Sequence, residues 1–575
     1  MSAGPPEYHG DAQAALHSNS QSSSLRHEEK ASVHDEITPA PAVTTGGHVA
    51  TEEFVSEAQR AAQAGQFNFR WASLWEPAVV NPLNGKSYTL PLFRIWDPYS
   101  VAFWMATLGF FSAFFSWFAF APLVTEAVKV DLKLTQDQIT NSNLASLGGT
   151  ALVRFAAGTA VDRYGPRKVM AVLLCLGAIP SALVPTISNI GGLETIRFFI
   201  SILGGTFVPT QAWTTTFFDK TIVGTANALS GGWGNLGGGV TPSVMIGLYE
   251  RLHKAGLSPH LAWRICFLVL PVPLLFLIAL TMMIIGKDHP AGKWSQRHQL
   301  PGTAVEVAQG GDVHLDSSEA REYEQSQSGR MEKGPAKGAD FRETGNQQVT
   351  TVDTSVSEPL TMKSFVAIIT DLRVWMVALC YMTTFGLETS LDAALPQLIN
   401  GLFASPTFTA VDAAFVASTY GLCNLYARPL GGIICDLLYH RFRHRGLGVR
   451  AKVIFLIATA VAQGVLMIGL GFYVDSGKAN LGGVIGFMVA LATTGFAANG
   501  AAYAVYGHLR PKNIGVVAGM VGGFGNIGGL WFTLIYKYQP GLKANRTLGR
   551  KFWIAGIFNT AIILPFAAVP LGDAN

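Results

Sequence analysis

The segment GGWGNLGG at residues 231–238 recurs as GGFGNIGG at residues 522–529. Six of the eight positions are identical, and the other two replace an aromatic with an aromatic and a Leu with an Ile. Both copies also fit the glycine spacing of a dinucleotide-binding loop, but that loop requires a preceding strand and a soluble helix. Here the flanking sequence is apolar, which favours close packing of helices through small residues. The chain therefore contains an internal repeat.

A second repeat relates three residues in each half of the chain. The first copy is Arg154, Gly158 and Asp162, and the second is Arg428, Gly432 and Asp436, with a constant offset of 274 residues. Steps of four residues place the members of each copy on one face of a helix. The two halves are therefore expected to share one helical design.

Composition indicates a membrane protein. Of 575 residues, 49% are hydrophobic and only 14% are charged, against about 25% charged in a typical soluble domain. Residues 1–99 hold 17 of the 78 charges and residues 287–363 hold 21, which leaves 40 for the other 399 residues. Such a sparsely charged body is not a soluble surface, and its expected surroundings are a lipid bilayer.

Other classes of protein are disfavoured. The net charge of +4 is too small to suggest a nucleic-acid partner. The five cysteines have no CxxC spacing, so neither a disulfide framework nor a zinc site is indicated. The sequence contains no HExxH or GxSxG motif, and we expect no enzyme activity, cofactor or metal. The sequence does not identify any protein partner.

Apolar runs long enough to cross a bilayer, about 20 residues each, predict an all-α polytopic protein with twelve transmembrane helices. They lie near 99–124, 139–161, 169–187, 195–218, 222–248, 263–286, 366–398, 411–438, 450–474, 481–506, 513–537 and 549–571. Helices are required because lipid cannot satisfy open backbone groups. The expected organisation is a disordered cytoplasmic tail (1–95), a six-helix half (96–287), a polar cytoplasmic linker (288–362) and a second six-helix half (363–575).

The distribution of Lys and Arg predicts the orientation. Short loops and helix ends alone do not decide it, because each side carries 11 such residues. Adding the parts of the tail and linker next to the helices gives 17 against 11. We therefore expect both termini and the linker in the cytoplasm.

Two arginines within apolar runs are the strongest functional signal. An ionised group inside a membrane is costly and usually lines a cavity. If Arg154 and Arg428 face one another, the cavity is positive and suits a planar oxyanion. The alternative is that each arginine pairs with a carboxylate, such as Asp162 or Asp436. Asn235 and Asn526 occupy equivalent positions in the two glycine segments. Their side-chain amides offer buried hydrogen-bond donors for an anion.

These motifs resemble a known family. The stretch RFAAGTAVDRYGPRK, residues 154–168, resembles a loop motif of the major facilitator superfamily, whose members contain two parallel six-helix repeats. Arg197 resembles a second motif of that superfamily. The paired glycine segments look like the two signatures of the nitrate/nitrite porter family. The polar linker and short C-terminal end are similar to its fungal type.

The resemblance implies roles for particular residues. It places substrate binding on Arg154, Arg428, Asn235, Asn526, Phe207, Tyr381 and Phe385. It places conformational gating on Asp162, Arg163, Gly234 and Gly525. The implied substrates are nitrate and nitrite, moved by alternating access of the two halves.

Glu388 is the candidate for proton coupling. It lies three residues after Phe385 and seven after Tyr381, so it shares their helical face. A carboxylate this far inside an apolar run is costly and suggests a function. The alternative is that Glu388 is a fixed partner of Arg154 or Arg428, and Asp392 is the other carboxylate candidate.

We therefore expect proton-coupled nitrate uptake across the plasma membrane. A negative cell interior opposes anion uptake by about 2.3 kcal/mol per 100 mV, so uptake requires a co-ion or a counter-anion. A nitrate/nitrite exchanger and a porter of another small anion stay open. A nitrate sensor is the alternative of another class.

Overall fold

The computed structural model describes residues 71–81, 84–297, 359–539 and 548–568. They fall within one compact unit, Val43–Asn575, and the other unit, Met1–Ala42, lies outside the described residues. Much of the predicted tail and linker, residues 1–70 and 298–358, also lies outside them. The described residues are helical, with only isolated β-bridges besides, so the predicted all-α fold class is confirmed.

The first half contains six helical spans at the predicted places. They are α2 (Pro98–Trp117) with α3 (Phe120–Leu123), α5 (Gln136–Tyr164), α6 (Pro166–Ala182), α7 (Ile190–Ile200) with α8 (Phe207–Phe217), α9 (Val223–Lys254), and α10 (Pro259–Val269) with α11 (Pro271–Ile285). A short helix, α4 (Lys129–Asp131), lies between the first two spans.

The second half repeats this organisation. Its spans are α16 (Leu372–Phe403), α17 (Ala410–Leu422) with α18 (Ala427–Phe442), α19 (Gly448–Asp475), α20 (Leu481–Leu509), α21 (Ile514–Tyr538) and α22 (Gly549–Ile563). A separate helix, α15 (Met362–Ile369), precedes α16, so the start of the predicted helix 366–398 is divided. The division lies at Asp371, whose side chain accepts a hydrogen bond from the Arg373 N–H and caps α16.

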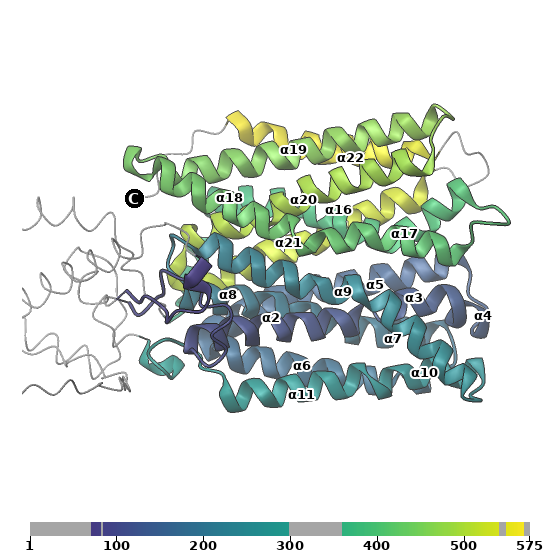
Figure 1. Ribbon diagram of the computed structural model, residues 1–575, viewed down its shortest axis with the longest axis horizontal. Coiled ribbons are helices and arrows are strands. Elements are labelled where there is room, and N and C mark those ends of the chain that lie inside the picture. The colour runs from purple at the N-terminus through teal and green to yellow at the C-terminus, as the bar shows by residue number, and fades with distance from the viewer. Residues whose placement is uncertain (1–70, 82–83, 298–358, 540–547, 569–575) are drawn as a thin grey trace, which may run out of the picture. The chain divides into compact units, whose positions relative to one another are not determined.

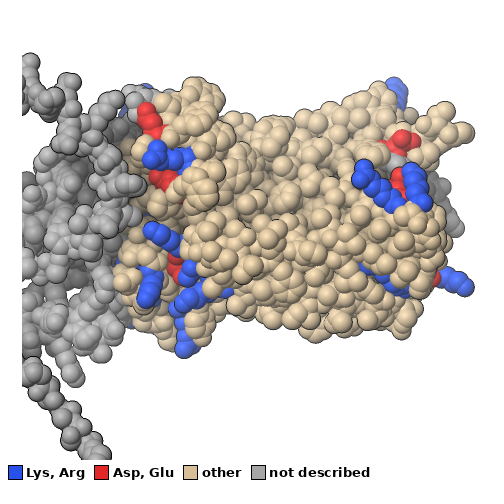
Figure 2. Space-filling model, turned by 60° about the horizontal axis from the view of Figure 1, so that its bottom comes forward, with Lys and Arg blue, Asp and Glu red and all other residues tan. Residues whose placement is uncertain are grey.

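The helices run along a common direction, with those of the first half on one side and those of the second on the other (Figure 1). Nine helical segments in the described residues are long and apolar enough to cross a membrane. The remaining three, α9, α17–α18 and α22, occupy predicted spans in the same bundle. On the face shown in Figure 2, charged side chains gather at the two ends and leave an uncharged band between them, as a bilayer requires.

The repeated Arg-Gly-Asp faces join the two halves. Helix α5 of the first half packs on α21 of the second, and α18 of the second packs on α9 of the first. A Cβ at Gly158 would lie 2.8 Å from the Gly515 carbonyl oxygen, and one at Gly432 would meet the Gly224 carbonyl. Glycine is required at both positions because the helix backbones approach closely.

The membrane-proximal ends of the tail and linker have a defined structure. The Ser87 N–H donates to the Phe217 carbonyl (2.9 Å), and the Asp219 N–H donates to the Ser87 carbonyl (2.9 Å). In the linker, the Trp294 indole donates to the Asp162 carbonyl (3.2 Å). Tyr88 in the predicted tail and Trp294 in the predicted linker both bury their rings.

Candidate functional site

Arg154 lies in the middle of α5 with a fully buried side chain. Its Nε donates to the Gly204 carbonyl (2.8 Å), and its Nη1 donates to the Gly522 carbonyl (2.9 Å) of the other half. The first acceptor lies in the 3-10 turn Ser201–Thr206 between α7 and α8. Its Nη2 has no hydrogen-bond partner among the described residues. Arg154 is thus a buried cation with one unused donor group.

Arg428 lies near the start of α18 and is also fully buried. Its Nη2 donates to Glu388 Oε2 at 2.5 Å, and its Nη1 lies 3.4 Å from the Gly231 carbonyl. Glu388 accepts two further hydrogen bonds, from Asn424 (3.1 Å) and Asn499 (2.7 Å). The carboxylate partner of Arg428 is therefore Glu388 and not Asp436.

The glycine segments supply the carbonyls that the arginines use. Arg154 and Asn526 both donate to the Gly522 carbonyl, and Arg428 and Asn235 both point to the Gly231 carbonyl. Each asparagine uses Nδ2 for this bond, at 2.7 Å for Asn235 and 3.1 Å for Asn526. Each amide nitrogen carries a second hydrogen that can serve a ligand.

Aromatic rings cover the Arg154 guanidinium. Its Cζ lies 4.7 Å from the centre of the Phe207 ring and 5.0 Å from that of Phe385. Tyr381 stacks on both of these rings, with centroids 5.8 and 4.9 Å apart. The three predicted aromatics therefore form one cluster beside Arg154. Cation–π contacts of this kind stabilise a desolvated guanidinium by about 2 kcal/mol.

Sequence reasoning missed Tyr503, which connects the two arginine sites. The Tyr503 hydroxyl lies 2.7 Å from that of Tyr381, and its ring centre lies 5.7 Å from Arg428 Cζ. It also missed Asn424 and Asn499, the donors to Glu388. A polar residue in an apolar run needs a partner when buried, and that signal could have identified Asn499 in GFAANGAAYAVYGH.

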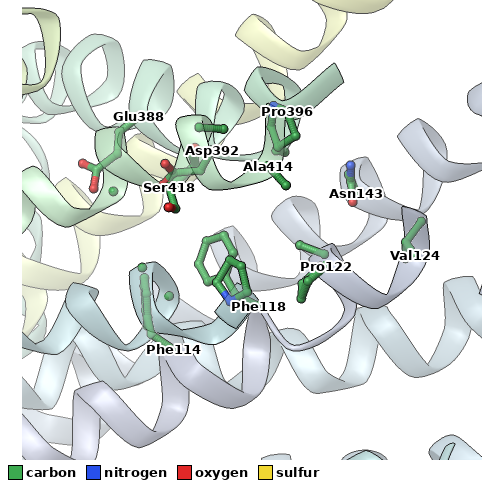
Figure 3. A pocket seen from close by; sticks show the side chains of 18 of the residues that line it. Phe114, Phe118, Pro122, Val124, Asn143, Glu388, Asp392, Pro396, Ala414 and Ser418 are labelled. Carbon is green, nitrogen blue, oxygen red and sulfur yellow. The ribbon is translucent and has the colours of Figure 1, made fainter. Parts of the chain in front are cut away.

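A cavity of about 130 Å³ lies between the halves and reaches this cluster. Phe385, Glu388 and Asn235 are among the residues that line it. From there it runs toward Pro122 and Pro396, near the helix ends opposite the tail (Figure 3). Arg154 and Arg428 are not among the lining residues, so the cavity reaches their neighbours Phe385 and Glu388 from the side opposite the tail.

On the tail side, two aspartates close the interface by capping helices of the other half. Asp162 accepts hydrogen bonds from the N–H groups of Gly515 (2.8 Å) and Val516 (2.9 Å), the second and third residues of α21. Asp436 accepts from the Thr225 N–H (2.6 Å) in the first turn of α9 and pairs with Lys452 (2.9 Å). A helix N-terminus attracts an anion through its free N–H groups and its dipole.

The other predicted gating residues lie elsewhere. Arg163 is exposed and contacts the Tyr164 ring of its own helix. Gly234 faces the Phe110 ring, and Gly525 faces the Tyr381 and Phe385 rings, at the level of the aromatic cluster. Their gating roles stay predictions. The described residues contain no group of three His, Cys, Asp or Glu side chains that could hold a metal ion.

Comparison with known proteins agrees with the geometry. The profile of the Major Facilitator Superfamily matches residues 106–533. The high-affinity nitrate transporter 2.3 of Oryza sativa subsp. japonica is 30% identical over 79% of this chain and 76% of its own length. The nitrate/nitrite transporter NrtP of Nostoc punctiforme is 25% identical over 80% of this chain and 91% of its own length.

A solved structure supports the fold. The proton:xylose symporter XylE matches with a TM-score of 0.53 at 15% identity, covering 82% of this chain and 95% of that one. Family profile, relatives and fold agree with the repeated motifs. The chain therefore belongs to the nitrate/nitrite porter family of the major facilitator superfamily, and it is a multi-pass membrane transporter rather than an enzyme.

Proposed function

We propose that this protein takes up nitrate, with nitrite as a second substrate, across the plasma membrane in symport with protons. The observation that carries the proposal is the state of Arg154. Its guanidinium is buried, has no carboxylate partner among the described residues and keeps Nη2 unused. An uncompensated buried charge is costly, and a bound anion would neutralise it.

Nitrate suits this site in charge and shape. It is singly charged and planar, and a guanidinium presents its donors in a matching plane. The relatives named above are nitrate and nitrite transporters. The second N–H of Asn235 or Asn526 would add a donor, while the rings of Phe207, Tyr381 and Phe385 would exclude water. A low local dielectric strengthens these bonds.

Glu388 supplies a physical basis for proton coupling. While it is ionised, Glu388 holds the Arg428 Nη2 in an ion pair. A proton on Glu388 neutralises the carboxylate and so breaks the ion pair. The Arg428 guanidinium is then free to bind nitrate. Protonated Glu388 and nitrate then favour one another's binding, which is what a symporter requires.

The proposed orientation places the tail side in the cytoplasm. The cavity then opens to the outside, and the Asp162 and Asp436 caps close the inner side. Alternating access would exchange these contacts for an outer closure as the halves rock about the midplane site. Arg163, Gly234 and Gly525 remain gating candidates in this scheme.

The test is uptake of labelled nitrate by the purified full-length protein in lipid vesicles, with and without an imposed pH gradient. We expect uptake that an acidic exterior accelerates and that external nitrite inhibits. Uptake that depends on internal nitrite and ignores the pH gradient would identify an exchanger and overturn the symport proposal. Binding without any flux would identify a sensor and overturn transport altogether.

A further inference from the structure

The two halves place different residues at equivalent positions around the cavity. The offset of 274 that relates Arg154 to Arg428 also relates three residues of the first helical span to three residues of α16. The pairs are Phe114 and Glu388, Phe118 and Asp392, and Pro122 and Pro396, and all six residues line the cavity. Two phenylalanines of the first half therefore correspond to two carboxylates of the second.

The two carboxylates lie at different depths. Asp392 follows Glu388 by one turn of α16 and shares its helical face. Figure 3 shows Glu388, Asp392 and Pro396 in a row along the helix, in the direction of the cavity's outer part. Glu388 is 2% exposed, whereas Asp392 is only partly buried. Within the described residues Asp392 has neither a hydrogen bond nor an ion pair, so the outer carboxylate is free to exchange protons with water.

We propose that Asp392 takes up protons from the outer cavity and passes them to Glu388. This inference rests on the proposed symport function. A hydronium ion in the cavity gives its proton to an Asp392 oxygen and becomes water. Asp392 then gives the proton to Glu388 and returns to a carboxylate. Glu388 becomes a neutral acid, and Arg428 loses its ionic partner.

A hydroxyl lies beside this route. Tyr420 of α17 is buried one turn before Asn424, which donates to Glu388, and its hydroxyl has no hydrogen-bond partner in the described part of the chain. A hydroxyl can accept one proton and donate another, so Tyr420 can connect the two carboxylates through water molecules. Phe114 and Phe118 line the opposite side of the cavity and offer no competing proton acceptor.

The charged and titratable groups around the pair come from five helices. They are Arg428 on α18, Arg197 on α7, Tyr420 on α17, Tyr503 on α20 and Tyr536 on α21. Arg428 contacts Glu388 and not Asp392. Because an ion pair makes a carboxylate a weaker base, the proton passes inward to Glu388 when a bound nitrate takes over the Arg428 guanidinium. Arg197 is the only Lys or Arg among the residues that line the cavity, and it donates to Ser142.

The experiment compares Asp392→Asn, Asp392→Glu and a matched control, Ser418→Ala, which changes another cavity-lining side chain. Each full-length variant is measured in vesicles for proton-driven nitrate uptake across a range of outer pH and for nitrate counterflow without a gradient. In Asp392→Asn we expect proton-driven uptake at neutral outer pH to fall about tenfold or more. Its pH profile should shift toward acid, while counterflow and apparent nitrate affinity stay near wild type.

Asp392→Glu should restore the wild-type pH profile, and Ser418→Ala should keep it. An unchanged pH profile in Asp392→Asn would overturn the relay. Equal loss of counterflow and proton-driven uptake in that variant would also overturn it, because Asp392 would then be structural. These outcomes differ from failure of the proposed function, in which the wild-type protein itself shows no proton-driven nitrate uptake.

Discussion

The two arginine sites occupy equivalent positions of the repeat but have different surroundings. Arg154 lies among aromatic rings and backbone carbonyls and keeps an unused Nη2. Arg428 pairs with Glu388, which Asn424 and Asn499 hold in place. The scaffold is therefore symmetric while its charges are not. One arginine carries an uncompensated charge suited to an anion, and the other can respond to a proton.

The tail-side closures show the same contrast. Asp162 and Asp436 each cap a helix of the other half, as the repeat requires. Only Asp436 also forms a buried ion pair, with Lys452. Asp162 has no ion pair within the described residues. Its backbone carbonyl instead accepts a hydrogen bond from the Trp294 indole. The two halves thus close the same interface with different stabilising groups.

Replacing the arginines should give the largest effect and separate the two sites. Lysine keeps the charge but loses the planar fork. Each lost charge-assisted hydrogen bond contributes about 1.5–3 kcal/mol, so apparent nitrate affinity should fall at least about tenfold in Arg154→Lys and in Arg428→Lys. Only Arg428→Lys should also change the pH dependence, because only Arg428 contacts Glu388.

The measurement is nitrate uptake at several concentrations and pH values, after surface expression is shown to be normal. Arg251→Lys, at an exposed position of α9, is the matched control and should behave as wild type. Unchanged affinity in either site variant would remove that arginine from the site. If Arg154→Lys and Arg428→Lys respond to pH in the same way, the proposed difference between the two arginine sites is wrong.

Replacing the capping aspartates should give an intermediate effect on stability. Asp436→Asn leaves Lys452 buried without a counter-charge, which costs about 3–5 kcal/mol. Asp162→Asn keeps an oxygen for only one of the two N–H donors, but it leaves no buried cation unpaired, so we expect a smaller loss of about 1–3 kcal/mol. Thermal unfolding of the purified variants checks this order. Adding Lys452→Met to Asp436→Asn should recover much of the loss, and equal destabilisation by the two single variants would contradict the account.

The asparagines should give the smallest effect. Asn235 and Asn526 already donate one N–H to a backbone carbonyl, so each has one hydrogen left for a ligand. Losing one hydrogen bond of about 1 kcal/mol lowers affinity roughly fivefold. Nitrate uptake by Asn235→Ala and Asn526→Ala should show this change in apparent affinity with maximal rate retained. A loss as large as that of the arginine variants would mean that the asparagines support the helix packing instead.

Much of this arrangement could be predicted from the sequence because the membrane restricts the choices. Apolar runs predict the positions of the spans, and the offset of 274 residues relates Arg154 to Arg428. The grouping of Phe207, Tyr381 and Phe385 agreed with the resemblance to the family. These features depend on periodicity and repetition, and both can be read directly from one amino-acid sequence.

Other features depend on contacts between distant residues. Glu388 could have paired with either arginine, and it meets Arg428 because α16 and α18 both pack on α20. The crossing of each motif to the other half, as in Asp162 with Gly515, has no local signal. Tyr503 looked like an ordinary residue of an apolar helix, and its partner lies 122 positions away.

The central claim is that Glu388 converts proton binding into release of Arg428. Net uptake of labelled nitrate into vesicles, driven by an inward proton gradient, tests it most directly when wild type and Glu388→Gln are compared. Glutamine imitates the protonated acid in shape but takes up no proton. We predict that the variant loses acceleration by the gradient while nitrate counterflow continues. Gradient-driven uptake that equals the wild type in Glu388→Gln would contradict the claim.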